Sequence, residues 1–197
     1  IASSTSTGRN VTIVDNTLTA GGVTGISGTT YAISLSSGLF TNVTIRGNKA
    51  QGHGSFCTVA CPTESLDISH NVASLTDFAG VSVGIKLENA GASARTLDGA
   101  VIMGNQFRNA SKAWLHLIGN GANTLTVNDM RAVFNPTLGT TAGILIDATA
   151  SLGATSMHAF NESVHATFQN TPTASAGLAT GSIWRDAADS NRAKMVP

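Results

Sequence analysis

Carboxyl groups are the first side chains in this sequence that could do chemistry, because glycoside hydrolases use two of them as acid and as base or nucleophile. Two of the 11 acidic residues have matching contexts: Glu88 follows the apolar segment 83–87, and Asp147 follows the segment 143–146. We therefore name Glu88 and Asp147 as the candidate catalytic residues. Solvated carboxylates at the ends of two strands are the simpler interpretation of both.

The expected separation of these two carboxylates also matters. If the two segments are equivalent strands of a stacked repeat, two strand spacings of about 4.8 Å separate the carboxylates by roughly 10 Å. This distance is near the upper end for the carboxyl pair of an inverting glycosidase. We therefore assign no active site within this segment, and a catalytic function of the parent chain stays an open alternative.

Other side chains that could bind or react are few. Trp114, at the start of a strand-like segment, is the candidate ligand-binding residue as a platform for a sugar ring, with packing as the alternative role. His116, on the same segment, is expected to be a surface histidine that points outward. Cys57 and Cys61 lack a second ligand pair, so we interpret them as small buried residues, with a local disulfide as the alternative. We predict no metal site and no cofactor.

The composition of the chain excludes some partners. Lys+Arg and Asp+Glu balance at 11 each, and charged residues are only 11% of the chain, so no basic surface is expected to hold a phosphate backbone. We therefore expect no nucleic-acid partner. No apolar run approaches the roughly 18 residues of a membrane span. The polar surface must consist of Ser, Thr, Asn and Gly, which suits stacked strands and also suits hydroxyl-rich ligands such as glycans.

A short motif recurs along the chain and must position these side chains. Its clearest copy is Val43-Thr44-Ile45 followed by Asn48, which places two apolar residues on one face of a strand. An Asn marks the end of four clear copies, and two degraded copies carry Met or Glu at the marker. The six predicted markers are Asn16, Asn48, Asn71, Asn105, Met130 and Glu162.

A second strand-like segment lies between successive markers, at 31–35, 55–59, 83–87, 114–117 and 143–146. Units of this length built from short strands predict a parallel β-helix with one coil per unit. The apolar residues before each marker would then stack into one column. Its predicted members are Val11/Ile13, Val43/Ile45, Leu66/Ile68, Ala100/Ile102, Leu125/Val127 and Met157/Ala159.

Each marker Asn has a predicted role at a corner of the coil. Asn tolerates the left-handed backbone conformation, and amides stacked at one corner can bond one another. A β-sandwich or jelly roll is the alternative architecture, since it also contains many short strands. It does not explain why Asn recurs at matched positions. The only helical alternative is a short helix over 77–87.

The rhythm of Ile33 and Leu35 followed by 42–48, and of Ile85 and Leu87 followed by 100–107, resembles the pectate-lyase-like β-helix superfamily. It is most similar to the versions in bacteriophage tailspikes and tail fibres, and the resemblance covers residues 10–165. It implies an all-β, right-handed parallel β-helix. It also implies a homotrimer, because tailspikes of this kind are typically trimeric.

The C-terminal segment resembles the tails of phage structural proteins, in which a Gly-rich stretch leads to an aromatic residue, here Trp184, and a basic, apolar strand follows. We predict a β-hairpin in which 182–186 pairs with 192–196 and caps the last coil. The expected organisation is a lead-in at 1–9, β-helix coils at 10–170 and a capping and trimerisation segment at 171–197. Because the first residue is Ile1 rather than Met, we expect a missing upstream region.

The leading functional hypothesis is a fragment of a phage virion receptor-binding protein, located on the virion tail, that recognises bacterial surface polysaccharide. Its partners would be further copies of itself, the glycan, and other virion proteins reached through the missing N-terminal region. One alternative is a fragment of a secreted bacterial polysaccharide lyase or hydrolase. The other is a purely structural trimerisation module without a ligand.

Overall fold

The computed structural model shows a chain built from β-strands. It describes residues 2–4, 10–20, 30–36, 40–60, 65–76, 81–133, 137–138, 143–153, 157–158, 183–186 and 192–195, with only the backbone for 2–4, 137–138, 157–158 and the last two segments. These residues contain no helix. The chain divides into two compact units, Ile1–Thr167 and Phe168–Pro197.

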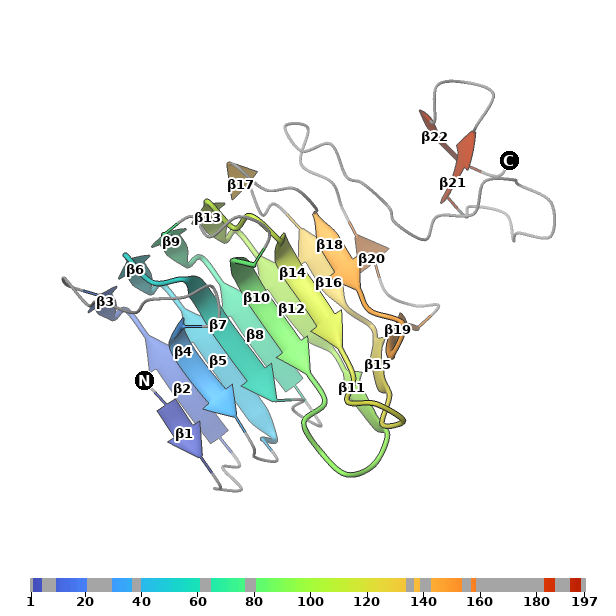
Figure 1. Ribbon diagram of the computed structural model, residues 1–197, viewed down its shortest axis with the longest axis horizontal. Coiled ribbons are helices and arrows are strands. Elements are labelled where there is room, and N and C mark those ends of the chain that lie inside the picture. The colour runs from blue at the N-terminus through green and yellow to red at the C-terminus, as the bar shows by residue number, and fades with distance from the viewer. Residues whose placement is uncertain are drawn as a thin grey trace. The chain divides into compact units, whose positions relative to one another are not determined.

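Two six-stranded parallel sheets form the larger unit's main layers (Figure 1). The spatial order in sheet A is β1 (Ala2–Ser4), β4 (Tyr31–Ser36), β7 (Ser55–Ala60), β10 (Val83–Glu88), β14 (Ala113–Ile118) and β18 (Ile144–Ile146). The order in sheet B is β2 (Asn10–Val14), β5 (Asn42–Arg46), β8 (Ser65–Ser69), β12 (Ala100–Met103), β16 (Arg131–Val133) and β20 (Met157–His158).

Two smaller parallel sheets connect these layers. Sheet C contains β17 (Thr137–Leu138), β13 (Gln106–Arg108), β9 (Val72–Ser74), β6 (Lys49–Gln51) and β3 (Thr17–Thr19). Sheet D contains β11 (Arg95–Asp98), β15 (Leu125–Asn128) and β19 (Ala150–Leu152). Strands of one sheet therefore come from successive passages of the chain.

The chain visits the sheets in a fixed order. From sheet A it passes to sheet B, in the later passages through sheet D, then to sheet C and back to sheet A. Each passage adds one parallel strand to each sheet that it visits. This topology is consistent with a parallel β-helix and confirms the predicted all-β class with parallel strands. The sandwich alternative requires antiparallel sheets, and the short helix over 77–87 is excluded where β10 occupies 83–88.

The apolar column of sheet B follows from its register. Ile45 lies opposite Ile68, and Ile68 lies opposite Ile102, all 0% exposed. The predicted members of this column are wrong for the last two coils. Leu125 and Val127 belong to β15 in sheet D, and Ile102 instead faces Ala132 of β16. In the next strand the residue opposite Ala132 is His158, rather than either predicted member Met157 or Ala159.

The left-handed corner lies one residue earlier than predicted. Positive φ angles occur directly before the four Asn markers rather than at them, and the residues that carry them are Asp15 (53°), Gly47 (65°), His70 (56°) and Gly104 (65°). Since the preceding residue supplies the turn, the marker side chain can point into the core. Asn48, Asn71 and Asn105 are accordingly 0% exposed.

The predicted amide ladder is confirmed. The Nδ2 atom of Asn16 donates to Oδ1 of Asn48 at 2.9 Å, that of Asn48 to Asn71 at 3.0 Å, and that of Asn71 to Asn105 at 2.9 Å. The same amides also donate to main-chain carbonyls, as Asn71 does to the carbonyl of Ile45 at 2.9 Å. Buried polar groups are therefore satisfied by one another along the stack.

The fifth predicted marker, Met130, is wrong. Val101 lies opposite Arg131 and Met103 opposite Val133, so in this register Met130 corresponds to Ala100 and not to Asn105. Met130 is instead a core residue, 0% exposed. Glu162, the sixth predicted marker, lies outside the described residues.

The smaller unit contains the predicted C-terminal hairpin. Strand β21 (Ile183–Asp186) pairs antiparallel with β22 (Arg192–Met195), with Ile183 opposite Met195. This pairing confirms the hairpin within one residue at each end. It is the one antiparallel sheet among the described residues.

Candidate functional site

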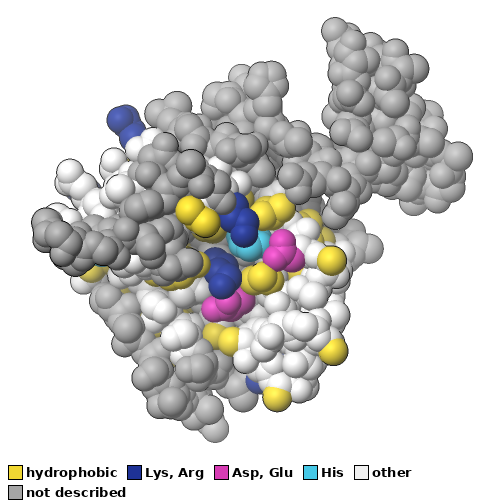
Figure 2. Space-filling model, viewed as in Figure 1, with side chains coloured by type: hydrophobic (Ala, Val, Ile, Leu, Met, Phe, Trp, Pro, Cys, Tyr) yellow, Lys and Arg dark blue, Asp and Glu magenta, His cyan; other side chains and the backbone are white. Residues whose placement is uncertain are grey.

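The outer face of sheet A gathers charged side chains that are otherwise scarce in this chain. Its inner row stacks apolar residues into the core, and its outer row brings Thr58, Lys86 and His116 side by side on β7, β10 and β14. Glu88 ends β10, and Asp147 directly follows β18. Figure 2 shows the Lys, Asp/Glu and His side chains together on this face, beside hydrophobic groups. We call Lys86, Glu88, His116 and Asp147 the sheet A cluster.

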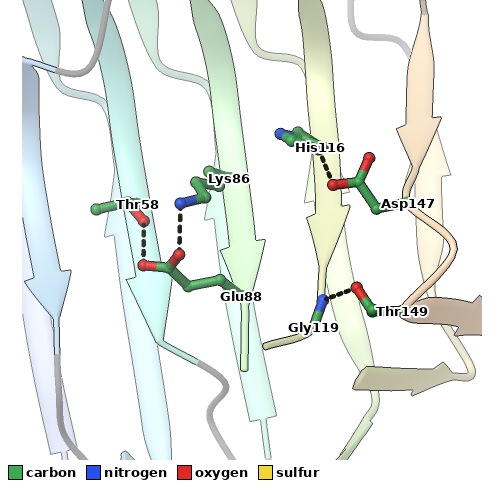
Figure 3. Close-up of polar contacts among 7 residues, drawn as sticks. All are labelled: Thr58, Lys86, Glu88, His116, Gly119, Asp147 and Thr149. Carbon is green, nitrogen blue, oxygen red and sulfur yellow. Dashed lines mark hydrogen bonds and ion pairs between the residues drawn. The ribbon is translucent and has the colours of Figure 1, made fainter. Parts of the chain in front are cut away.

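Strand β10 contributes an ion pair to the cluster. Alternation along the strand puts Lys86 and Glu88 on the same face, and the Lys86 ammonium contacts the Glu88 carboxylate. The other carboxylate oxygen accepts a hydrogen bond from the Thr58 hydroxyl at 3.3 Å (Figure 3). Both charged side chains are only 22% exposed. Partial shielding from water makes this pair stronger than an ion pair in full solvent.

A histidine–carboxylate contact forms the second half of the cluster. Nε2 of His116 lies 3.1 Å from Oδ2 of Asp147 (Figure 3), although the atoms are not aligned for a straight hydrogen bond. His116 is 3% exposed, so the prediction of a surface histidine is wrong. Its side chain does point toward the outer face of sheet A, as expected, because it shares that face with Lys86. The Asp147 side chain remains 34% exposed.

The protonation state of His116 follows from its surroundings. Burial lowers the pKa of His116 from its usual value, and the ammonium groups of Lys112 and Lys86 act in the same direction, while contact with Asp147 opposes them. The imidazole is therefore neutral at neutral pH. A neutral imidazole beside a carboxylate can exchange hydrogen bonds with a hydroxyl group without adding charge to the site.

Local backbone contacts hold Asp147 in place. Its N–H donates to the carbonyl of Leu117 at 3.0 Å, which extends the pairing of β14 and β18 by one residue. The hydroxyl of Thr149 accepts a hydrogen bond from the N–H of Gly119 at 2.9 Å (Figure 3). A Cβ atom on Gly119 would lie 2.4 Å from the carbonyl oxygen of Thr149, so this close approach requires glycine.

The two candidate carboxylates occupy the expected places in the stack. Glu88 lies opposite Ile118, and Asp147 continues the register of β18 on the far side of β14, so the two residues are two strands apart. This spacing again gives roughly 10 Å between backbones. Each carboxylate has its own cationic or imidazole neighbour, and neither lies beside the other.

Trp114 is placed for packing in the described structure. It is 7% exposed and belongs to the hydrophobic core. A Cβ atom on Gly84 would lie 2.5 Å from the Trp114 carbonyl oxygen and 2.5 Å from the ring of Phe107, so the neighbouring strand is packed tightly here. The Phe107 ring also contacts that of Phe56, with centroids 5.3 Å apart. The buried position leaves little of the indole for a ligand.

The remaining candidates are structural or lie outside the site. Cys57 is a free, fully buried thiol, as the interpretation as a small apolar residue predicts, and burial raises its pKa. Cys61 lies outside the described residues. No group of three or more His, Cys, Asp and Glu side chains that could hold a metal occurs in the described part of the chain. Among the same residues, no helix could cross a membrane.

Sequence reasoning missed Lys86 and the role of His116. The available signal was their position: each lies between two apolar residues of a second strand-like segment, as in Ile85-Lys86-Leu87 and Leu115-His116-Leu117. Equivalent central positions in successive coils must stack. Aligning those segments with one another would have placed Thr58, Lys86 and His116 in one row.

Comparisons with protein-family models, with curated proteins and with solved structures find no match for this chain.

Proposed function

We propose that this chain is part of a phage virion receptor-binding protein, a tailspike or tail fibre, that attaches to bacterial surface polysaccharide. The observation that carries the proposal is the sheet A cluster. It places hydrogen-bond donors and acceptors in register across β7, β10 and β14 on a scaffold that repeats along one axis. A polysaccharide also repeats along one axis, so parallel rows of polar groups suit it.

The rigidity of the scaffold supports a binding role. Each strand of sheet A from β4 to β14 pairs with a parallel strand on both sides, and their inner row of Ile33, Cys57, Ile85 and Leu115 is 0% exposed. Side chains on such a face are held before the ligand arrives, so little conformational entropy is lost on binding. Rigid presentation benefits affinity for flexible glycans.

The assembly is part of the same proposal. In it, the coils form a right-handed β-helix, the β21–β22 hairpin covers the end of the coils, and three chains associate. The resemblance to tailspikes supports the trimer, and the exposed strand edges at the end of any such stack give the hairpin a physical purpose. Other virion proteins would bind an upstream region, and the location would be the virion tail.

Binding to purified bacterial surface polysaccharides tests the function. We expect the 197-residue chain to bind at least one such polysaccharide, and Asp147→Asn to weaken that binding. Asp98→Asn is the matched control, because Asp98 lies in sheet D and accepts a hydrogen bond from Asn128. Binding that neither variant weakens would place the glycan elsewhere, and a chain that binds none of the polysaccharides would refute the proposal. Light scattering tests the trimer, and a monomer would refute it.

A hydrolase or lyase is the second candidate, and one observation favours it. His116 and Asp147 form an imidazole–carboxylate pair on the same face as Glu88. Imidazole and carboxylate groups are both used for acid–base catalysis. Loss of chain length when the bound polysaccharide is incubated with the protein, abolished in Glu88→Gln, would support an enzyme. An unchanged chain length would leave the binding protein as the function of this segment.

A further inference from the structure

We propose that the polysaccharide bound by the sheet A cluster is uncharged, and that its hydroxyl groups bridge the carboxylates and the nitrogen groups of the cluster. This inference rests on the proposed function and specifies its ligand class.

Charge balance is the first argument. The ammonium groups near the site, Lys86 and Lys112, equal in number the carboxylates Glu88 and Asp147, and His116 is neutral. Lys86 is already in contact with Glu88. A sugar carboxylate that pairs with Lys86 would have to displace Glu88 from that contact and would then approach two fixed negative charges. Such like-charge contacts reject the wrong partner.

The complementary chemistry favours hydroxyl groups. A sugar hydroxyl both donates and accepts, so it can donate to Glu88 while it accepts from Lys86, and neither charge is removed from its partner. The Thr58 hydroxyl adjoins the same carboxylate at 3.3 Å. The equivalent donor and acceptor pair one strand further along is His116 with Asp147. Neighbouring strands repeat about every 4.8 Å, so adjacent hydroxyl groups of one polymer can meet both pairs.

The buried imidazole gives an independent observation. His116 is 3% exposed, and its Nε2 atom has no aligned hydrogen bond despite the nearby Asp147. Buried polar atoms are rarely left without a partner, so the space beside this one can take a further hydrogen-bonding group. A ligand hydroxyl that approaches from solvent beside the partly exposed Asp147 carboxylate and bridges it to Nε2 supplies that partner without adding charge.

The first experiment compares ligand classes. The chain is titrated against purified neutral bacterial polysaccharides and against uronate-containing ones, at about 50 mM and about 500 mM salt. We expect binding to neutral polymers only, with affinity that changes less than about twofold with salt, and a loss of at least about tenfold in Asp147→Asn but not in Asp98→Asn. Salt-sensitive binding to acidic polymers alone would refute this inference and leave the proposed function intact. Absence of binding to every polymer would refute the proposed function itself.

The second experiment tests the charge argument with a defined probe. Glu88→Gln leaves the Lys86 ammonium without its carboxylate, so we expect this variant to bind polygalacturonate at least about tenfold more tightly than the unaltered chain, with an affinity that falls as salt rises. The double variant Lys86→Gln, Glu88→Gln should lose that gain. Equal circular dichroism spectra and urea midpoints establish that the variants are folded. A Glu88→Gln variant that gains no affinity for polygalacturonate would refute the inference.

Discussion

The replacement of Asn71 by alanine is the sharpest test of how the coils are held together. Asn71 lies in the middle of the amide ladder and is 0% exposed. Its Oδ1 atom accepts hydrogen bonds from N and Nδ2 of Asn48, both at 3.0 Å. Its Nδ2 atom donates to the Ile45 carbonyl and to Oδ1 of Asn105, both at 2.9 Å. Alanine removes all four bonds within the core.

The expected loss of stability follows from these contacts. A buried hydrogen bond contributes about 1 kcal/mol net, so four of them give about 4 kcal/mol. This is a large part of the 5–15 kcal/mol by which a typical domain is stable. The end of the ladder provides the control, since Asn16→Ala removes the two Nδ2 bonds to Val14 and Asn48 at a half-buried position. Water can reach that site, so we expect a loss of about 1 kcal/mol.

Urea unfolding followed by circular dichroism, at one fixed protein concentration, measures both variants. Asn71→Asp adds a second test, because its carboxylate would face the Ile45 carbonyl and Oδ1 of Asn105 instead of donating to them. Burial raises the pKa of such a carboxyl, so its destabilising effect should decrease as the pH falls and the group is protonated. If Asn71→Ala loses no more free energy of unfolding than Asn16→Ala, the ladder does not stabilise the fold as we infer.

Three further outcomes follow from individual contacts. Gly84→Ala should cost about 2–3 kcal/mol in urea unfolding, because the new methyl group would overlap Phe107 and the Trp114 carbonyl. Gly121→Ala is the control: its Cβ would meet nothing within 4 Å, but its φ is 58°, so it should cost only about 1 kcal/mol. Equal losses of unfolding free energy in the Gly84 and Gly121 variants would contradict a packing clash at Gly84. The lowered pKa of His116 means that the unfolded chain binds a proton more readily, so stability should fall as the pH decreases below about 6.5. The urea midpoint of His116→Gln should depend less on pH between about 7.5 and about 5.5 than that of the unaltered chain, and an equal dependence would exclude His116 as the cause.

The sequence predicted the class of fold because the signal is local. Alternating residues such as Val43 and Ile45 define strands, and the Asn three residues later defines a recurring corner. The errors arose where a non-local register decides. Met130 was chosen as a marker from its distance to the strand at 125–127, but that strand joins sheet D, and β16 at 131–133 continues sheet B. An insertion of one extra strand in the later coils shifts the count, and only pairing between coils reveals it.

The candidate site shows the same division. The sequence identified Glu88 and Asp147 by their matching positions after apolar segments, and the register confirms that they lie two strands apart on one sheet. It did not identify Lys86 as the partner of Glu88, nor the burial of His116. Those properties depend on which residues of other coils lie on either side. His116 and Asp147 are far apart in the sequence, so no local pattern indicates their contact.

What the sequence determined by itself is therefore the repeating unit: short strands, a recurring Asn after the clear copies of the motif, and a surface with little charge. Strand periodicity and the polar nature of Asn act over a few residues, so they can be read without coordinates. What only the tertiary structure decided is the register between coils. Register sets which residue supplies the left-handed turn, which Asn residues form the ladder, and which side chains meet on sheet A. The physical reason is that side chains on a sheet repeat every two residues, so a shift of one position moves a residue between the core and the surface.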